Sequence, residues 1–261
     1  EWLAGDARQK IKTPLEPADE LVALSVDGGQ AKLRLKGQPA ELKLPKGITI
    51  GEGHLPGRQA LHFSGNAFLE LPNVEGFQAE QPFSVAIWFY LPKPEDSFIV
   101  ASQTDASSKG RGWSFDLTRR SPTIRLVGAG GRALTLSGLV VDRFDPGTWV
   151  HLAFSYDGKR TAEGFRMFVN GKPTHAQGSG KGGRLNGEIK TFAPLLIGSM
   201  GDRFFDGGAI ADFRVYGRTL SDDDAALLAA WPALELARGK RELGAAERDG
   251  FRTYYFLREH G

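Results

Sequence analysis

The chain contains no cysteine among its 261 residues. This absence excludes disulfide bonds, thiol nucleophiles and zinc sites built on thiolates. It also excludes haem attachment through a C-x-x-C-H motif within this stretch of sequence. Any stability must therefore come from packing and hydrogen bonds, and any chemistry from other side chains.

Strong charge of one sign is lacking as well. Lys and Arg number 33 against 31 Asp and Glu, which leaves a formal charge of +2 at pH 7. A charge so close to balance offers no electrostatic footprint for nucleic acid, and we expect no such partner. No apolar run approaches the roughly 20 residues that span a bilayer, so we expect no membrane span. The chain begins with Glu1 and shows no signal peptide, which favours a piece of a longer protein or a processed form.

Motifs for catalysis and for cofactors are scarce. The histidines are scattered, with no two at metal-ligand spacing. The strand-like stretches contain few carboxylates, whereas glycoside hydrolysis usually requires a pair, and no G-x-S-x-G elbow is present. The G-x-G-x-x-A match at 128–133 precedes a strand pattern rather than a helix and predicts a hairpin loop, and 178–184 predicts a flexible loop. We therefore expect no catalytic residue, no metal ligand and no required cofactor.

Short alternating stretches with Gly-rich turns fill the chain from about residue 21 to residue 220. The stretch PFSVAIWFYLP alternates between two faces and is bounded by proline, as expected of a strand. Asn170-Gly171 is the pair most typical of a two-residue hairpin. The pattern predicts an all-β fold, an antiparallel two-sheet jelly-roll sandwich. The side chains predicted between the sheets are Val85, Ile87, Phe89, Leu152, Phe154, Val169, Phe213 and Val215.

The sequence turns helical and charged at Ser221. Ser221 can cap a helix, and the acidic residues 222–224 fall in its first turn, where the helix dipole favours anions. Pro232 is predicted to end this pattern, with further helix after it. The predicted organisation is an N-terminal linker (1–20), a jelly-roll domain (21–230) and a helical C-terminal extension (231–261).

The order and spacing of several pieces resemble the laminin G-like, concanavalin A-like jelly roll of bacterial surface proteins. The resemblance runs from about residue 21 to residue 230. Its strongest pieces are W-x-H-x-A-F-x-Y-D-G at 149–158 and G-x-I-A-D-F-R-V-Y-x-R-x-L-S at 208–221. In that family the second piece is the final strand, which runs beside the N-terminal strand and is followed by a short helix. Where many members have two acids in this strand, Ala211 replaces the first.

The flanks resemble linkers in large planctomycete-type exported multi-domain proteins. This resemblance implies an exported location, which would be extracellular, cell-surface or periplasmic. It also implies neighbouring domains of a longer chain as partners.

Residues opposite the predicted core supply the candidate ligand-binding site. Aromatic faces beside Arg, Asp and His groups suit a sugar, which has apolar C–H faces and a rim of hydroxyls. The alternative is structural: the two sheets need not present these residues on one surface, and Asp116 and Arg125 could form a cross-strand ion pair. Asp212 could instead hold a structural calcium. The candidates are Trp88, Asp116, Arg125, His151, Phe168, Asp212 and Arg214.

Three functions remain open from the sequence. The first is a non-catalytic module that binds a glycan or a protein. The second is a structural spacer that docks neighbouring domains through its helical end. The third is a polysaccharide hydrolase or lyase on the same fold.

Overall fold

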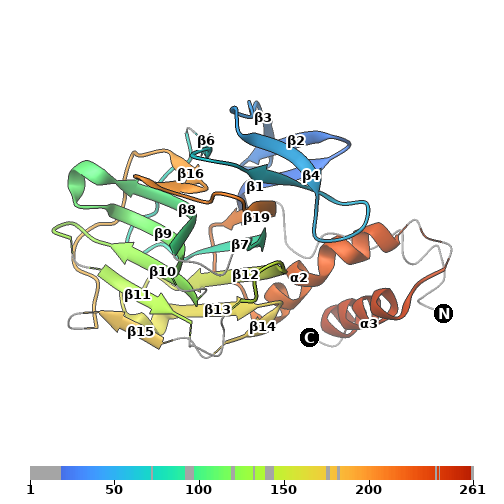
Figure 1. The fold of residues 1–261 in the computed structure, drawn as a ribbon. Coiled ribbons are helices and arrows are strands. Elements are labelled where there is room, and N and C mark those ends of the chain that lie inside the picture. The colour runs from blue at the N-terminus through green and yellow to red at the C-terminus, as the bar shows by residue number, and fades with distance from the viewer. Residues whose placement is uncertain are drawn as a thin grey trace.

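The predicted strands pair antiparallel into two stacked sheets, with two helices at the C-terminal end (Figure 1). This arrangement confirms the jelly-roll prediction. The computed structural model describes residues 19–71, 73–91, 97–118, 121–131, 133–138, 144–174, 177–180, 183–238, 240 and 242–259.

The larger sheet has ten strands in the order β14-β13-β12-β7-β19-β1-β2-β3, with β5 paired to β19 and β4 paired to β5. The final strand, β19, lies between β7 and the first strand, β1, as the family resemblance implied. The strands are β1 (Glu20–Asp27), β2 (Gln30–Leu35), β3 (Gln38–Ala40), β4 (Ile48–Glu52), β5 (Gln59–Phe63), β7 (Phe83–Tyr90), β12 (Trp149–Tyr156), β13 (Phe165–Val169), β14 (Lys172–Pro173) and β19 (Ala209–Tyr216).

The second sheet has seven strands in the order β15-β11-β10-β9-β8-β16-β6. A separate hairpin, β17 (Ser199–Met200) with β18 (Arg203–Phe204), follows β16. The seven strands are β6 (Leu69–Leu71), β8 (Ser97–Asp105), β9 (Arg111–Thr118), β10 (Ser121–Val127), β11 (Ala133–Ser137), β15 (Gln177–Gly180) and β16 (Leu195–Ile197), and two 3-10 turns are η2 (Ala106–Ser108) and η4 (Ala162–Gly164).

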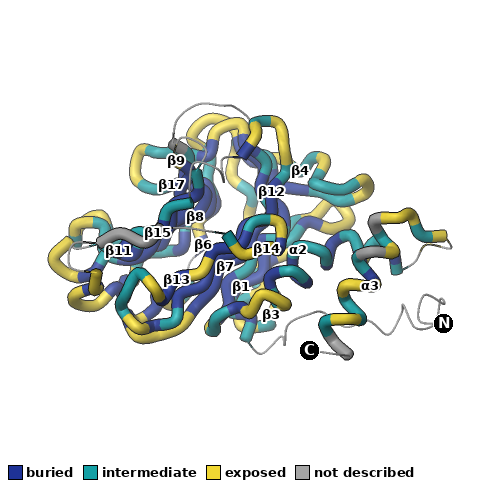
Figure 2. The backbone as a smooth tube through the Cα atoms, turned by 90° about the horizontal axis from the view of Figure 1, so that it is seen from below, coloured by how far each residue is buried: buried dark blue, intermediate teal, exposed yellow. Residues whose placement is uncertain are grey.

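The core lies between the two sheets, as Figure 2 shows by the dark-blue strands. Strand alternation sends one face of each strand inward, and antiparallel register aligns the inward positions, for example Leu152 with Ile87. All eight side chains predicted between the sheets belong to this core, Val169 as a partly buried member at its edge.

One of the two predicted Gly-rich loops is confirmed, and the other is partly wrong. The Gly-rich stretch after Val127 is a hairpin loop between β10 and β11, as predicted. The predicted loop at 178–184 is wrong in its first part, because residues 177–180 form β15. Pairing with β11 along the sheet edge, Leu134 opposite Gly180, supplies hydrogen bonds that the Gly-rich composition did not suggest.

The turn Asn170-Gly171 has positive φ at both residues, 49° and 77°, as the two-residue hairpin prediction requires. The turn also lies against α2 (Asp222–Ala237), and a Cβ at position 171 would come within 2.9 Å of Ala226 Cα. Glycine is needed here both for its conformation and for this close approach.

The helical end confirms the predicted cap and corrects the predicted break. Ser221 Oγ accepts from Asp224 N, and the Asp224 carboxylate accepts from Ser221 N, a reciprocal capping box. Pro232 does not end the helix, which continues to Ala237. Proline removes one backbone donor, and the burial of Trp231, Pro232 and Leu234 outweighs that loss.

A second helix, α3 (Ala245–Glu259), packs against α2 and buries Phe251 with Trp231 and Leu234. The helical character predicted after Pro232 is therefore confirmed. The boundary predicted between residues 230 and 231 falls inside α2, and the predicted linker of residues 1–20 lies outside the described residues except for its last two positions.

Candidate functional site

Four of the seven predicted site residues lie together on the outer face of the ten-stranded sheet. Trp88 on β7 is directly opposite His151 on β12, with ring centroids 5.4 Å apart. Asp212 and Arg214 lie on the neighbouring strand β19, whose residue Ala211 pairs with Trp88. The chain therefore does assemble part of the predicted constellation.

Helix α2 covers one end of this face. Phe168, predicted as an outward aromatic, faces away from the sandwich core but is fully buried. It packs with Ala153 and Tyr216 of the sheet and with Ala225 and Leu228 of α2. A ligand in solution cannot reach the ring of Phe168 in this arrangement.

The loop between β4 and β5 covers the other end. His54 stacks on Trp88 with centroids 4.3 Å apart and an interplanar angle of 12°. Trp88 is half-buried, and its Nε1 has no hydrogen-bond partner among the described residues. The sequence does not reveal this role of His54, because a residue in a loop has no periodicity that indicates which strand it will cover.

Burial controls the protonation of both histidines. Desolvation lowers the pKa of His54 to about 4, although Asp212 opposes this effect. Desolvation likewise lowers the pKa of His151 to about 3. Both rings are neutral at pH 7 and act as polar packing beside Trp88 rather than as cations.

Arg214 belongs to an ion-pair chain. Arg214 Nη1 lies 2.6 Å from Glu20 Oε2, and Glu20 Oε1 also pairs with Arg34 Nη2 at 2.7 Å. Arg214 Nη2 lies 2.7 Å from Asp212 Oδ1. Burial alone would lower the pKa of Arg214, but the neighbouring carboxylates raise it, so the guanidinium stays charged. These ion pairs link the strands β1, β2 and β19.

Asp212 has a left-handed backbone with φ of 54°, at the bulge where β19 shifts register against β7. A pocket of about 430 Å³ adjoins it, between β1, β2, the β4–β5 loop and α2. Arg58 from the loop pairs with Glu235 of α2 at this pocket. Among the described residues no three His, Asp or Glu side chains converge as a metal site.

Asp116 and Arg125 lie on the other sheet, so the structure does not bring them to the Trp88 surface. They are on adjacent strands, as predicted, but in register Asp116 faces Thr123 and Arg125 faces Ser114. The ion pair of Asp116 is with Arg203 of the β17–β18 hairpin, at 3.4 Å. Burial raises the pKa of Asp116, opposed by Arg125 and Arg203.

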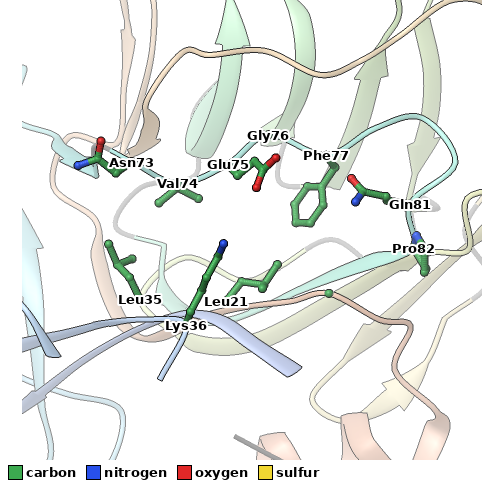
Figure 3. A pocket seen from close by; sticks show the side chains of 11 residues that line it. Leu21, Leu35, Lys36, Asn73, Val74, Glu75, Gly76, Phe77, Gln81 and Pro82 are labelled. Atoms are coloured by element: carbon green, nitrogen blue, oxygen red, sulfur yellow. The ribbon is translucent and has the colours of Figure 1, made fainter. Parts of the chain in front are cut away.

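An open surface lies instead at one rim of the sandwich. A pocket of about 480 Å³ lies between the segment 73–82 and the ends of β1 and β2, and Figure 3 shows the side chains that line it. Leu21, Leu35 and Phe77 supply its apolar walls. Its polar groups are those of Lys36, Asn73, Glu75 and Gln81, and the Lys36 side chain points toward the segment that carries Glu75 and Phe77.

A second pocket, of about 490 Å³, lies against the same segment and the loop 190–194. Its wall carries Phe192, whose side chain is 95% exposed. Lys190 Nζ bridges to Glu75 Oε1 at 2.6 Å, which joins the two loops by charge. An aromatic ring is thus displayed to solvent beside ammonium, carboxylate and amide groups.

Buried contacts hold this rim in place. Gln103 of β8, only 1% exposed, donates from Nε2 to Val74 O at 2.7 Å and to Ala193 O at 3.2 Å. Gly76 lies so close to Thr191 that a Cβ would approach the Thr191 carbonyl oxygen to 2.5 Å. The loops that carry Glu75 and Phe192 are therefore fixed before any ligand arrives.

Phe192 is not among the predicted site residues, because it lies outside every predicted strand. The available signal was an aromatic residue in TFAP, outside any alternating stretch and two residues before Pro194. The role of Gln103 was not apparent either, because its neighbours in the sequence do not show that its amide bonds to two loops distant in sequence.

The fold and the rim define a jelly-roll module with an open, aromatic-bearing surface. The chain belongs to the concanavalin A-like lectin/glucanases superfamily, because residues 63–226, more than half of its length, match that family. A comparison with the curated proteins gives no match. No helix of the part described is long and apolar enough to cross a membrane.

Solved structures with the same fold include bacterial toxin domains. The binding domain of Paraclostridial Mosquitocidal Protein 1 superposes with a TM-score of 0.67 at 15% identity, over 83% of this chain and 53% of that one. The ligand-binding domain of botulinum neurotoxin serotype D, solved with N-acetylneuraminic acid, gives 0.65 at 13% identity, over 84% and 52%. This chain thus spans about half of their length, and the likeness at such identity concerns the fold alone.

Proposed function

We propose that this chain is a non-catalytic carbohydrate-binding module of an exported multi-domain protein, and that the rim around Phe192 is its binding surface. The observation that carries the proposal is the 95% exposure of Phe192 on a loop that Gln103 fixes. An aromatic ring held open to solvent beside polar groups offers a ligand an apolar surface to cover. The C–H face of a sugar matches such a ring, and the adjoining polar groups match its hydroxyls.

The comparisons support this class of function without naming a ligand. The family description includes lectins, and the serotype D neurotoxin domain was solved with a sialic acid. The export and the neighbouring domains rest on the resemblance of the flanks. Non-catalytic function is consistent with Asp116, which is 1% exposed and paired with Arg203 rather than free in a cleft.

The test is a glycan array with the purified chain, followed by calorimetry on every glycan bound. Phe192→Ala should weaken binding at least tenfold, because a central exposed aromatic dominates recognition. The thermal midpoint should stay within about 2 °C, because surface substitutions rarely change stability by more than ~0.5 kcal/mol. Phe256→Ala, which truncates a 67% exposed aromatic on α3, is the matched control and should bind as the parent does.

Two other outcomes would redirect the assignment. Release of reducing ends from a polysaccharide panel would make the chain a hydrolase. No binding to any glycan would leave the spacer function, which one observation favours: α3 packs on α2 and extends the module beyond the sandwich (Figure 1).

A further inference from the structure

The two rim pockets share one wall. Asn73, Val74, Glu75 and Gly76 line both the 480 Å³ pocket and the 490 Å³ pocket. We call these four residues the ridge. Small-molecule sites generally measure about 300–1,000 Å³, so each pocket alone reaches that range. A single sugar unit therefore cannot fill both sides of the ridge.

The ridge is held rigidly in place and does not close over either pocket. Gln103 binds the ridge backbone at Val74 O and the opposite loop at Ala193 O through a single amide. Glu75 is held by Lys190. With the contact between Gly76 and Thr191, these bonds leave little freedom for the two pockets to merge or to move apart. A ligand that occupies both has to cross the ridge.

The two pockets offer different but compatible surfaces. One has apolar walls at Leu21, Leu35 and Phe77, and the other has the exposed ring of Phe192. Each can receive an apolar sugar face. Between them, the hydrogen-bonding groups of the ridge can meet the linkage region and its hydroxyls.

The charges around the ridge balance. Two lysines, Lys36 and Lys190, and two glutamates, Glu70 and Glu75, line the two pockets, and Lys190 is paired with Glu75. Lys190 and Lys36 both lower the pKa of Glu75, so its carboxylate is ionised at pH 7. A charged ligand would meet a repulsive partner for every attractive one, whereas neutral hydroxyls can both donate and accept.

We propose that the ligand is a neutral oligosaccharide chain that crosses the ridge and occupies both pockets at once. This inference rests on the proposed carbohydrate function of the same rim. It adds that recognition requires length, so that neither end of a polysaccharide is needed, and that acidic chains are excluded.

Two substitutions separate the pockets. Phe192→Ala removes the aromatic surface of one. Gly217→Gln places a side chain in the other, because Gly217 lines the pocket that contains Leu21 and not the pocket that contains Phe192. The three atoms nearest to a Cβ at position 217 all belong to the Leu21 side chain and lie 3.5 Å or more away, so the substitution is compatible with the fold. Circular dichroism and the thermal midpoint check that both variants fold.

The experiment measures calorimetric affinity for glucose and for β-1,3- and β-1,4-linked glucose oligomers of two to six units. The array's strongest neutral glycan is measured in the same way, and oligogalacturonides serve as acidic chains. The expected result is an affinity that rises at least tenfold from the monosaccharide to the longest chain of the series that binds. Gly217→Gln should remove that gain while leaving the weak binding of short units, and Phe192→Ala should weaken both.

Binding of a monosaccharide as tightly as of any oligomer, or a preference for oligogalacturonides, would overturn the inference and leave the carbohydrate function standing. Binding that depends on chain length but is unchanged by Gly217→Gln would show that the pocket containing Leu21 takes no part, and would overturn the inference that both pockets are occupied. Absence of any glycan binding, or capture of extended peptides that depends on Phe192, would overturn both proposals.

Discussion

Acidification should destabilise this protein through His54 and His151. Both rings are packed beside Trp88 and have pKa values lowered to about 4 and about 3. In the unfolded chain a histidine binds a proton near pH 6.5. As the pH falls below that value, the unfolded state gains protons that the folded state does not accept. A depressed folded-state pKa therefore contributes stability above pH 6.5 that is lost as pH falls.

The magnitude follows from proton linkage. A histidine that stays neutral in the folded protein but is protonated in the unfolded chain lowers the free energy of unfolding. The loss is about 1.4 kcal/mol for each pH unit below 6.5. Between pH 6.5 and pH 5 this amounts to about 2 kcal/mol for the buried His151 and somewhat less for the half-buried His54. The pair together should remove about 3–4 kcal/mol, which is a large part of the ~5–15 kcal/mol that stabilises a typical domain.

Urea denaturation at pH 7.5, 6.5, 5.5 and 5.0 measures this loss. The comparison is with the double variant His54→Phe/His151→Phe, which keeps ring-shaped side chains but cannot titrate. Carboxylates with lowered pKa, such as Asp27 and Glu75, lose their contribution only below their ordinary range, outside this window. The raised pKa of Asp116 acts in the opposite direction and cancels in the comparison.

The double variant should lose about 3–4 kcal/mol less than the parent between pH 6.5 and pH 5. Its absolute stability at pH 7.5 does not enter the test, because only the pH dependence is compared. If parent and double variant show the same slope, the rings are not held neutral by the fold, and the reasoning about the covered Trp88 surface is wrong.

Three further predictions concern stability. Leu152→Ala should cost about 2–5 kcal/mol in urea denaturation, since Leu152 is fully buried between the sheets, and a loss below ~1 kcal/mol would contradict that position. Glu20→Gln should cost about 2–4 kcal/mol because it leaves Arg214, 15% exposed, and Arg34 without their shared carboxylate; Glu41→Gln, in an exposed pair with Lys43, should cost less than ~0.5 kcal/mol and serves as its control. Gly112→Ala should abolish soluble expression, because φ is 131° and the new Cβ would lie 1.9 Å from Gln103 O; a stable variant with an unchanged thermal midpoint would refute that backbone geometry.

Local sequence determined the strands, the turns and the helix start. The period of two in PFSVAIWFYLP assigned Val85, Ile87 and Phe89 to the core, because adjacent residues of a strand must point to opposite faces. Asn170-Gly171 and Ser221 acted through backbone conformation and capping within a few residues. The superfamily followed from the order of such pieces.

Tertiary structure decided what covers each outward face. Alternation shows that Trp88 and Phe168 point away from the core. It does not show that the β4–β5 loop places His54 on Trp88, or that α2 covers Phe168. Pro232 stays inside a helix for the same reason, because contacts distant in sequence outweigh a local penalty. The exposure of Phe192 depends on Gln103, which joins two loops about 120 residues apart. Local patterns fix which way a side chain points, whereas its accessibility depends on long-range packing that only the folded chain brings together.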